Sequence, residues 1–428
     1  MSLKLELPRG MRDIESMESS TIEYVRQKFI ETSNLFGFQF MEPSPIELLS
    51  VIETKSGPSI KNEIYHFTDK GDREVALRFD FTIGLTRFAT SQKSIRLPTK
   101  ISTFGGVWRY DEPQKGRYRF FHQWDIEIYG EPSIESDAEI IDFTSKFISR
   151  LGLENIVIDI CDRELVESYV KDVFKSDSPN VIGDILRAVD KIQKKRKQDI
   201  INEYQEKGYS VPELEQILKF SEIKGLPNEI EKQIDTSQIK NWDKILQLFD
   251  TLKNRGVNNA RINFGIVRGL DYYSGIIFEV FEKNFDVGAL VGGGRYDTLT
   301  RAFGRSDLGA TGAAGGVERI ALLLEKQQVS TKNSESRVSV VFINSDMQKI
   351  AINVASKLRL NGIPTDVDLS GKSLKKQMEI ASTSKRVIIV APKEYADNCV
   401  IIRNMEDGSE KQIQLDVMLN DVKSSLQL

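Results

Sequence analysis

The stretch FGGVWRYDEPQKGRYRFFHQWDIEIYG at residues 104–130 is the most informative part of this chain for both fold and chemistry. Two strand patterns flank a polar loop at residues 111–119. Along the second strand, the side-chain period of two places Trp124, Ile126 and Ile128 on a face that packs the core. The other face carries an aromatic ring, an amide and two carboxylates, on Phe121, Gln123, Asp125 and Glu127. Such a set on one face of a strand indicates a binding site rather than a core surface.

Arginines lie at both ends of this polar loop. Arg109 ends the first strand, and Arg117 and Arg119 close the loop. A guanidinium stays charged in any protein environment and its fork matches phosphate oxygens. The hairpin is therefore a candidate phosphate-binding site. An exposed hairpin with a solvated run of charges is the alternative that this stretch alone leaves open.

A second polar set lies on LRFDFT at residues 77–82, where we predict a strand from Val75 to Phe81. Alternation places Arg78, Asp80 and Thr82 opposite three apolar side chains. A carboxylate beside a hydroxyl can accept and orient an ammonium group. Taken alone, the segment is better explained as an ordinary amphipathic strand.

Three further segments combine glycine with polar residues. In VRGLDYYSG at 267–275, Arg268 and the paired tyrosines suggest a loop that delivers polar groups to a cleft, although a charged surface loop explains them equally well. GGGRYD at 292–297 and GAAGGVER at 312–319 let backbone approach a ligand or a neighbouring strand. Arg319 lies off the apolar stripe of the helix that follows. The turn is not a P-loop, because no GK[ST] is present.

Composition excludes several classes of protein. The length of 428 residues suggests two or three domains, and the hydrophobic fraction of 40% is enough to form their cores. Its only cysteines are Cys161 and Cys399, so we expect no disulfide framework and a reducing, cytoplasmic setting. Its only histidines, His66 and His122, argue against a typical zinc site or a Ser-His-Asp triad. We expect no membrane span and no signal peptide.

Changes in charge and in strand and helix patterns along the sequence predict five segments. A charged, helix-like module interrupts the strand-rich part, and its basic Lys194–Lys197 cluster fits either an RNA contact or a solvated helix face. A polar stretch then precedes alternating strand and helix patterns, which are typical of a small α/β domain. The predicted boundaries are a first catalytic part at 1–164, the helical insertion at 165–253, a second catalytic part at 254–326, a linker at 327–336 and a C-terminal domain at 337–428.

In this order, these segments resemble the class II aminoacyl-tRNA synthetases, and closely the histidyl-tRNA synthetases. LPRGMRDI is similar to the opening of that family, GFQFMEPSPIEL to motif 1 and IYHFTDKGDREVALRFDFT to the stretch before its amino-acid site. RYDEPQKGRYRFFHQWDIE resembles motif 2, VRGLDYYSG the signature of the histidine enzymes, and GGVERIALLLE motif 3. The C-terminal module, with LKKQMEIA, resembles the class IIa anticodon-binding domain. The similarity covers nearly the whole chain and is weakest at 165–253. VRGLDYY is its most specific element.

The resemblance implies a fold and an activity. The fold would be an α+β catalytic domain built on an antiparallel sheet, with a helical insertion and a C-terminal α/β anticodon-binding domain. The activity would be that of a ligase that uses ATP and Mg²⁺ to convert L-histidine to histidyl-adenylate and transfers it to the 3′ end of tRNA(His). The enzyme would be a cytoplasmic homodimer, with Pro45 at the subunit interface.

The resemblance also implies roles for individual residues. Arg109 and Arg268 would be catalytic. The ATP-binding set would be Arg109, Asp111, Arg117, Phe121 and Arg319, with Phe121 stacked on adenine. The histidine-binding set would be Asp80, Thr82, Gln123, Glu127, Arg268, Tyr272 and Tyr273, with Glu127 and Tyr273 at the imidazole. No residue is expected to be a metal ligand.

Three residues depart from the common family pattern. Asp80 stands where many bacterial members carry Glu, so LRFDFT is more similar to the archaeal and eukaryotic form. Asp111 also replaces a common Glu, and Glu112 occupies an often basic position. These departures bear on the tRNA acceptor-end contacts and not on the activation chemistry.

Three other functions remain as alternatives. One is a non-catalytic, synthetase-like regulatory paralogue of histidine biosynthesis. Such proteins typically lack the C-terminal domain and lose the arginines, whereas this chain has both. A second is a class IIa synthetase for glycine, proline or threonine, against which VRGLDYY and Glu127 argue. A third is a structural RNA-binding protein, which would have no use for phosphate-binding arginines.

Overall fold

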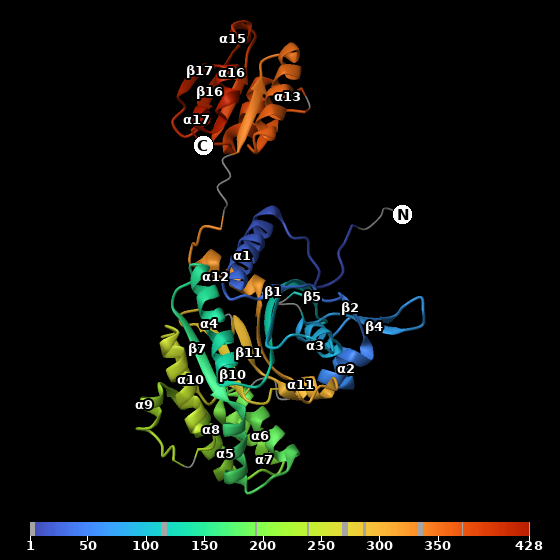
Figure 1. Cartoon of the computed structure of the whole chain (residues 1–428), viewed down its shortest axis with the longest axis vertical. Coiled ribbons are helices and arrows are strands. Elements are labelled where there is room, and N and C mark those ends of the chain that lie inside the picture. Colours follow the sequence, from blue (N-terminus) through green and yellow to red (C-terminus); the bar gives the residue numbers. More distant parts are fainter. Residues whose placement is uncertain are drawn as a thin grey trace. The chain divides into compact units, whose positions relative to one another are not determined.

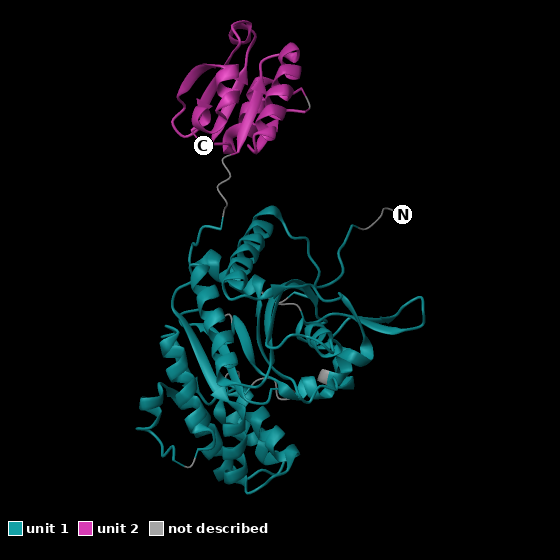
Figure 2. Cartoon of the chain, in the orientation of Figure 1, with its two compact units in different colours: residues 1–332 teal, residues 333–428 magenta. Residues whose placement is uncertain are grey.

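A computed structural model provides the structure of the chain, which forms two compact units, residues 1–332 and 333–428 (Figure 2). Each unit is described by itself. The structure describes residues 5–112, 118–192, 195–237, 239–267, 273–285, 288–331, 337–369 and 371–427. Within these residues, no helix combines the length and the apolar character that a membrane span requires.

A nine-stranded sheet forms the centre of the first unit (Figure 1). In spatial order the strands are β1 (Gln39–Phe40), β5 (Thr99–Trp108), β6 (Phe120–Gly130), β12 (Gly309–Gly316), β11 (Val291–Arg295), β10 (Ile276–Glu282), β7 (Ile156–Asp162), β9 (Ala260–Asn263) and β8 (Lys224–Gly225). The predicted antiparallel pairing is confirmed from β5 through β6, β12, β11 and β10 to β7, whereas β1–β5 and β7–β9 pair in parallel.

Helices cover one face of this sheet and build the main core. They are α1 (Ser16–Leu35), α4 (Ile134–Arg150), α10 (Trp242–Asn254) and α12 (Val317–Lys326). Their apolar stripes pack against the strand residues Trp124, Ile126 and Ile128, as the period of two predicts. Phe29 of α1 contacts the ring of Trp124, with the ring centroids 5.6 Å apart. The opposite face of β6 therefore remains available for polar side chains.

A small three-stranded sheet, in the order β2–β4–β3, lies beside the main one. The predicted strand from Val75 to Phe81 is too long, because β4 ends at Leu77 and Thr82 begins α3. The backbone turns here because the Asp80 carboxylate accepts the Ile83 N–H at 3.3 Å, as a residue before a helix often does. The elements are β2 (Ile46–Leu48), α2 (Leu49–Ser56), η1 (Pro58–Asn62), β3 (His66–Thr68), β4 (Glu74–Leu77), α3 (Thr82–Ser91) and α11 (Asp297–Ala302).

Between β7 and β9 the chain is mainly helical and has its own hydrophobic core. The basic cluster lies at the start of α7, and its described side chains pair with carboxylates: Lys195 with Glu203, Arg196 with Asp199 and Lys197 with Glu222. Such pairing favours a solvated helix face over an RNA contact. The helices are α5 (Arg163–Phe174), α6 (Pro179–Lys191), α7 (Lys197–Glu206), α8 (Val211–Ser221), α9 (Pro227–Ile230) and α10.

The second unit is an α/β domain around a five-stranded sheet, in the order β14–β13–β15–β16–β17. The first three strands are parallel, and a hairpin turning at Gly408 joins the last two. The single last helix that the sequence predicts is two short helices. The elements are β13 (Val338–Phe342), α13 (Ser345–Leu360), β14 (Thr365–Val367), α14 (Leu374–Ile380), η2 (Ala381–Thr383), β15 (Arg386–Val390), α15 (Pro392–Ala396), β16 (Cys399–Asn404), β17 (Glu410–Gln414), α16 (Leu415–Asn420) and α17 (Val422–Leu426).

Candidate active site

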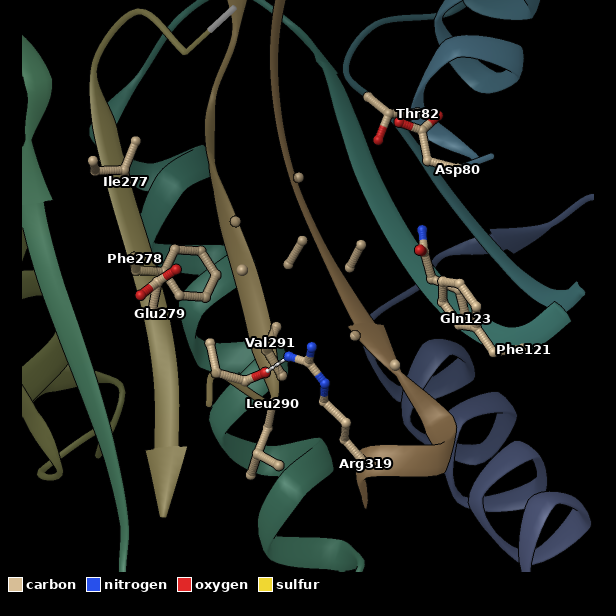
Figure 3. Close-up of a pocket in the computed structure, with 18 of the residues that line it drawn as sticks. Asp80, Thr82, Phe121, Gln123, Ile277, Phe278, Glu279, Leu290, Val291 and Arg319 are labelled. Carbon is tan, nitrogen blue, oxygen red and sulfur yellow. Dashed lines mark hydrogen bonds between the residues drawn. The ribbon is translucent and has the colours of Figure 1, made fainter. Parts of the chain in front are cut away.

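A cavity of about 370 Å³ lies on the face of the main sheet opposite α1 and α4 (Figure 3). Its volume falls in the range typical of small-molecule sites. Strands β6, β12, β11 and β10 form its floor, and α12 and the segment before α3 contribute to its walls. Nine of the residues predicted for the site line it: Asp80, Thr82, Arg109, Asp111, Phe121, Gln123, Glu127, Tyr273 and Arg319. The predicted Arg117, Arg268 and Tyr272 lie outside the described residues.

Arg109 is held at the edge of the cavity by contacts from two sides. Its Nε donates to the Phe79 carbonyl at 2.9 Å, and its Nη2 donates to Gln123 Oε1 at 3.3 Å. The guanidinium carbon lies 5.1 Å from the centre of the Phe121 ring. The arginine, the ring and the amide thus form one surface, which combines a phosphate-binding charge with a flat aromatic face.

Asp80, Thr82 and Gln123 form a polar wall at one end of the cavity (Figure 3). Next to them lies Asp125, which was predicted to share a strand face with Gln123 and is fully buried. Its carboxylate accepts from Thr82 Oγ1 at 3.4 Å and from Gln123 Nε2 at 3.5 Å. Acceptors dominate this wall, so it suits an ammonium group.

Glu127 is a buried carboxylate that the surrounding residues hold in place. The Tyr296 hydroxyl donates to it, and Tyr296 is itself 3.4 Å from the Tyr129 hydroxyl. Burial, followed by the nearby Glu127 charge, raises the pKa of Tyr296 well above its usual value, so the phenol keeps its proton and donates it. Gly312 lies opposite on β12, where a Cβ atom would overlap the Glu127 carboxylate. The fold therefore reserves space for this charge.

Arg319 enters the cavity from the first turns of α12 (Figure 3). Its Nη1 donates to the Ala289 carbonyl at 2.8 Å. The floor between Arg319 and the Gln123 wall is rich in glycine, and a Cβ at Gly292 or Gly316 would meet no protein atom within 4 Å. Backbone here is open to a ligand at close range.

The N-terminal segment holds the described ends of the polar loop after β5. The Gly10 and Arg9 carbonyls accept from the backbone N–H and Nη1 of Arg119, both at 3.1 Å. The Arg12 guanidinium lies 3.9 Å from the centre of the Tyr118 ring and 3.8 Å from Glu318. Glu318 in turn accepts the His122 backbone N–H at 2.9 Å. The opening of the chain thus supports one wall of the cavity.

Four polar side chains of the lining were not predicted from the sequence: Tyr118, Glu279, Tyr296 and Glu318. Tyr296 carried a signal, because GGGRYD was identified as a segment whose backbone approaches a ligand or a neighbouring strand. Tyr296 reaches Glu127 because β6 pairs with β12 and β12 pairs with β11. The local sequence pattern does not predict which strands become neighbours. Glu279 lies on a strand that reads as an apolar run, and no local feature distinguishes it.

Comparisons with known proteins show the family to which the chain belongs. A family model described as histidyl-tRNA synthetase matches residues 10–320, and one described as anticodon binding domain matches residues 337–425. The chain belongs to the histidyl-tRNA synthetase family. A histidine–tRNA ligase from Pyrococcus horikoshii is 34% identical over 433 residues, which cover 99% of each chain. A chloroplastic/mitochondrial one from Arabidopsis thaliana is 30% identical and covers 95% of this chain and 85% of its own.

Solved structures share the fold. The histidyl-tRNA synthetase from Nostoc sp. PCC 7120 has a TM-score of 0.82 at 20% identity, over 99% of this chain and all of that one. A Bacillus halodurans protein named ATP phosphoribosyltransferase regulatory subunit/histidyl-tRNA synthetase has a TM-score of 0.75 at 22% identity. At such identities the likeness concerns the fold alone. The full-length relatives named as ligases support a histidyl-tRNA synthetase rather than the regulatory paralogue.

Proposed function

We propose that the chain is a histidine–tRNA ligase whose cavity binds ATP and L-histidine side by side. One observation carries the proposal. In a chain of this family, a single cavity joins two arginines, Arg109 and Arg319, to a buried carboxylate, Glu127, that a tyrosine holds in place. The arginines suit a triphosphate, and the carboxylate suits an imidazole N–H.

ATP would occupy the part of the cavity between Arg109 and Arg319. Arg109 would contact the α-phosphate and Arg319 the tail phosphates, while adenine would stack on Phe121. Arg117 and Asp111 would complete the site. The short distance from Arg109 to the Phe121 ring supports this placement of ATP, because the adenine and the α-phosphate would then bind to one continuous surface.

Histidine would lie with its α-ammonium group at the acidic wall and its imidazole at Glu127. The ammonium group would meet Asp80, Thr82 and Gln123, with the buried Asp125 charge behind them. Glu127 would accept one imidazole N–H, and Tyr273 and Tyr272 would complete that end. Tyr296 would hold the Glu127 carboxylate in position. A site of buried polar groups rejects amino acids that leave those groups without partners.

The chemistry would proceed by positioning and charge stabilisation. An oxygen of the histidine carboxylate attacks the α-phosphorus of ATP, the bond to the β-phosphate oxygen breaks, and pyrophosphate leaves. Arg109 and Arg268 would neutralise the charge that grows on the α-phosphate. A hydroxyl of the terminal tRNA ribose then attacks the carbonyl of the mixed anhydride and AMP departs. A phosphate oxygen of the adenylate would accept the proton.

Mg²⁺ would accompany ATP. The cavity carries two arginines for phosphate, and no three ligating side chains gather into a metal site anywhere in the described ranges. Mg²⁺ commonly binds through substrate phosphates, water and one or two carboxylates, so these residues fit an ion that comes with the nucleotide. When bound, it would neutralise charge on the departing pyrophosphate.

We further propose a cytoplasmic homodimer. Strand β1 lies at the edge of the main sheet, and the side chains of Phe40, Ile46, Leu48 and Phe67 are at least two-fifths exposed. Exposed apolar side chains on edge strands favour association with a second copy. Both cysteines are free and buried, which fits a reducing compartment. Light scattering at micromolar concentration should give twice the chain mass of 48.6 kDa.

Substitution of the phosphate-binding arginines tests the mechanism. We expect Arg268→Ala and Arg109→Ala each to reduce histidine-dependent ATP–pyrophosphate exchange by at least about a hundredfold, because each removes charge stabilisation at the reacting phosphate. Arg305→Ala, at an exposed ion pair with Asp307, is the control and should stay within about twofold. Near-normal exchange by a folded Arg268→Ala protein would contradict the assignment.

A further inference from the structure

Two tyrosines that the proposed function places near the imidazole come from segments far apart in the sequence. Tyr273 precedes β10, and Tyr296 lies between β11 and α11. Both line the cavity, whereas the residues that follow them, Ser274 and Asp297, do not. A selective site needs these rings at a fixed separation, because a shift of about 1 Å can cost much of the binding energy of a pocket.

Ser274 joins the two segments with reciprocal hydrogen bonds. Its backbone N–H donates to the Arg295 carbonyl at 2.8 Å, and its Oγ accepts the Asp297 backbone N–H at 3.0 Å. These bonds bind the residues on either side of Tyr296. The Tyr296 N–H itself donates to the Ala310 carbonyl at 2.8 Å. Ser274 thus fixes the position of its own backbone, next to Tyr273, relative to the backbone on either side of Tyr296.

Buried charges anchor this junction to the rest of the unit. Asp297 Oδ1 accepts the Ala310 N–H at 2.8 Å and lies 3.3 Å from Arg295 Nη1. Arg295 forms two hydrogen bonds with Asp137 of α4, at 2.8 and 3.1 Å, and both side chains are buried. A paired guanidinium and carboxylate in this geometry resist displacement, since separating them would leave a charge unpaired away from water.

We propose that Ser274 and Asp297, anchored through Arg295 to Asp137, are positioning residues that set the spacing of Tyr273 and Tyr296 and thereby the affinity for the histidine side chain. This inference rests on the proposed function. Neither residue touches the substrate. They act on the imidazole end of the cavity and leave the ATP end, at Arg109 and Arg319, unchanged.

The test is a comparison of Michaelis constants in the exchange reaction of the full chain. Ser274→Ala leaves the Asp297 N–H without its acceptor, a loss whose usual scale corresponds to about a tenfold change in affinity. We expect the KM for histidine to rise about tenfold while the KM for ATP stays within about twofold. Ser274→Thr restores the hydroxyl and should return the KM for histidine to near the wild-type value. Ser20→Ala, at an exposed serine of α1, is the matched control.

Asp297→Asn is a second variant of nearly the same shape, and it should raise the KM for histidine in the same selective way. It also serves if Ser274→Ala does not fold, as judged by its circular dichroism melt. Equal rises in both Michaelis constants, or an unchanged KM for histidine in folded variants, would overturn the positioning role. The exchange rate of the wild-type protein tests a separate point. If it showed no histidine-dependent exchange, the proposed function itself would be overturned.

Discussion

At the scale of single residues, the position of one glycine explains how a carboxylate is accommodated inside the protein. Gly312 pairs with Glu127 across β12 and β6, and any side chain there would overlap the carboxylate. Tyr296 supplies the hydrogen bond that a buried charge requires. The alternation along β6 predicted that Glu127 faces a site. The roles of Gly312 and Tyr296 could not be predicted, because they depend on which strands become neighbours.

Gly312→Ala should therefore strongly impair histidine recognition, and it would also press on the Ile126 carbonyl oxygen, which a Cβ would meet at 2.6 Å. The added methyl group displaces the Glu127 carboxylate, so we expect kcat/KM for histidine in pyrophosphate exchange to fall by about a hundredfold or more. Gly183→Ala, in the middle of α6, meets no atom closer than 3.7 Å and should leave exchange unchanged. Wild-type kinetics in a folded Gly312→Ala protein would contradict the place given to Glu127.

At the scale of elements, the hairpin of β5 and β6 and the N-terminal segment make one wall. Sequence periodicity predicted the two faces of β6 because successive side chains along a strand point to opposite faces of the sheet. The predicted length of β4 was too great, because the Asp80 carboxylate accepts the Ile83 N–H and the chain turns into α3 after Leu77. Periodicity also missed the contacts of residues 9–12 with the loop, which join segments about a hundred residues apart.

Arg12→Ala tests whether this N-terminal contact supports the nucleotide site. Arg12 stacks on Tyr118 and faces Glu318, and both residues line the cavity near Arg319. Loss of a cation–π contact on this scale should raise the KM for ATP about fivefold. Arg9→Ala removes an exposed ion pair with Glu112 and should change the same constant by less than about twofold. Equal effects of the two substitutions would indicate that Arg12 has no special role.

At the scale of the whole molecule, the chain contains two units with separate hydrophobic cores. The cavity lies wholly in the first unit, and the core of the second is made from residues 338–426 alone. The polar stretch at 327–336 predicted a boundary of this kind. The family model for the second unit indicates tRNA as its partner. We therefore expect amino-acid activation and anticodon binding to be separable by deletion of the second unit.

A protein truncated after residue 331 should keep amino-acid activation and lose efficient charging. We expect histidine-dependent exchange within about threefold of the full chain, because no core residue of the first unit is removed. Charging of tRNA(His) should fall by about a hundredfold, since about 3 kcal/mol of tRNA binding would be lost with the second unit. Aminoacylation with labelled histidine measures this. Undiminished charging would remove the second unit from tRNA recognition.

The central claim, that this cavity activates histidine and no other amino acid, is tested most directly by ATP–pyrophosphate exchange of the wild-type chain with each of the twenty amino acids. We predict exchange with histidine, and rates with the other nineteen lower by at least about a hundredfold. Exchange driven by glycine, proline or threonine, or by no amino acid at all, would contradict the account.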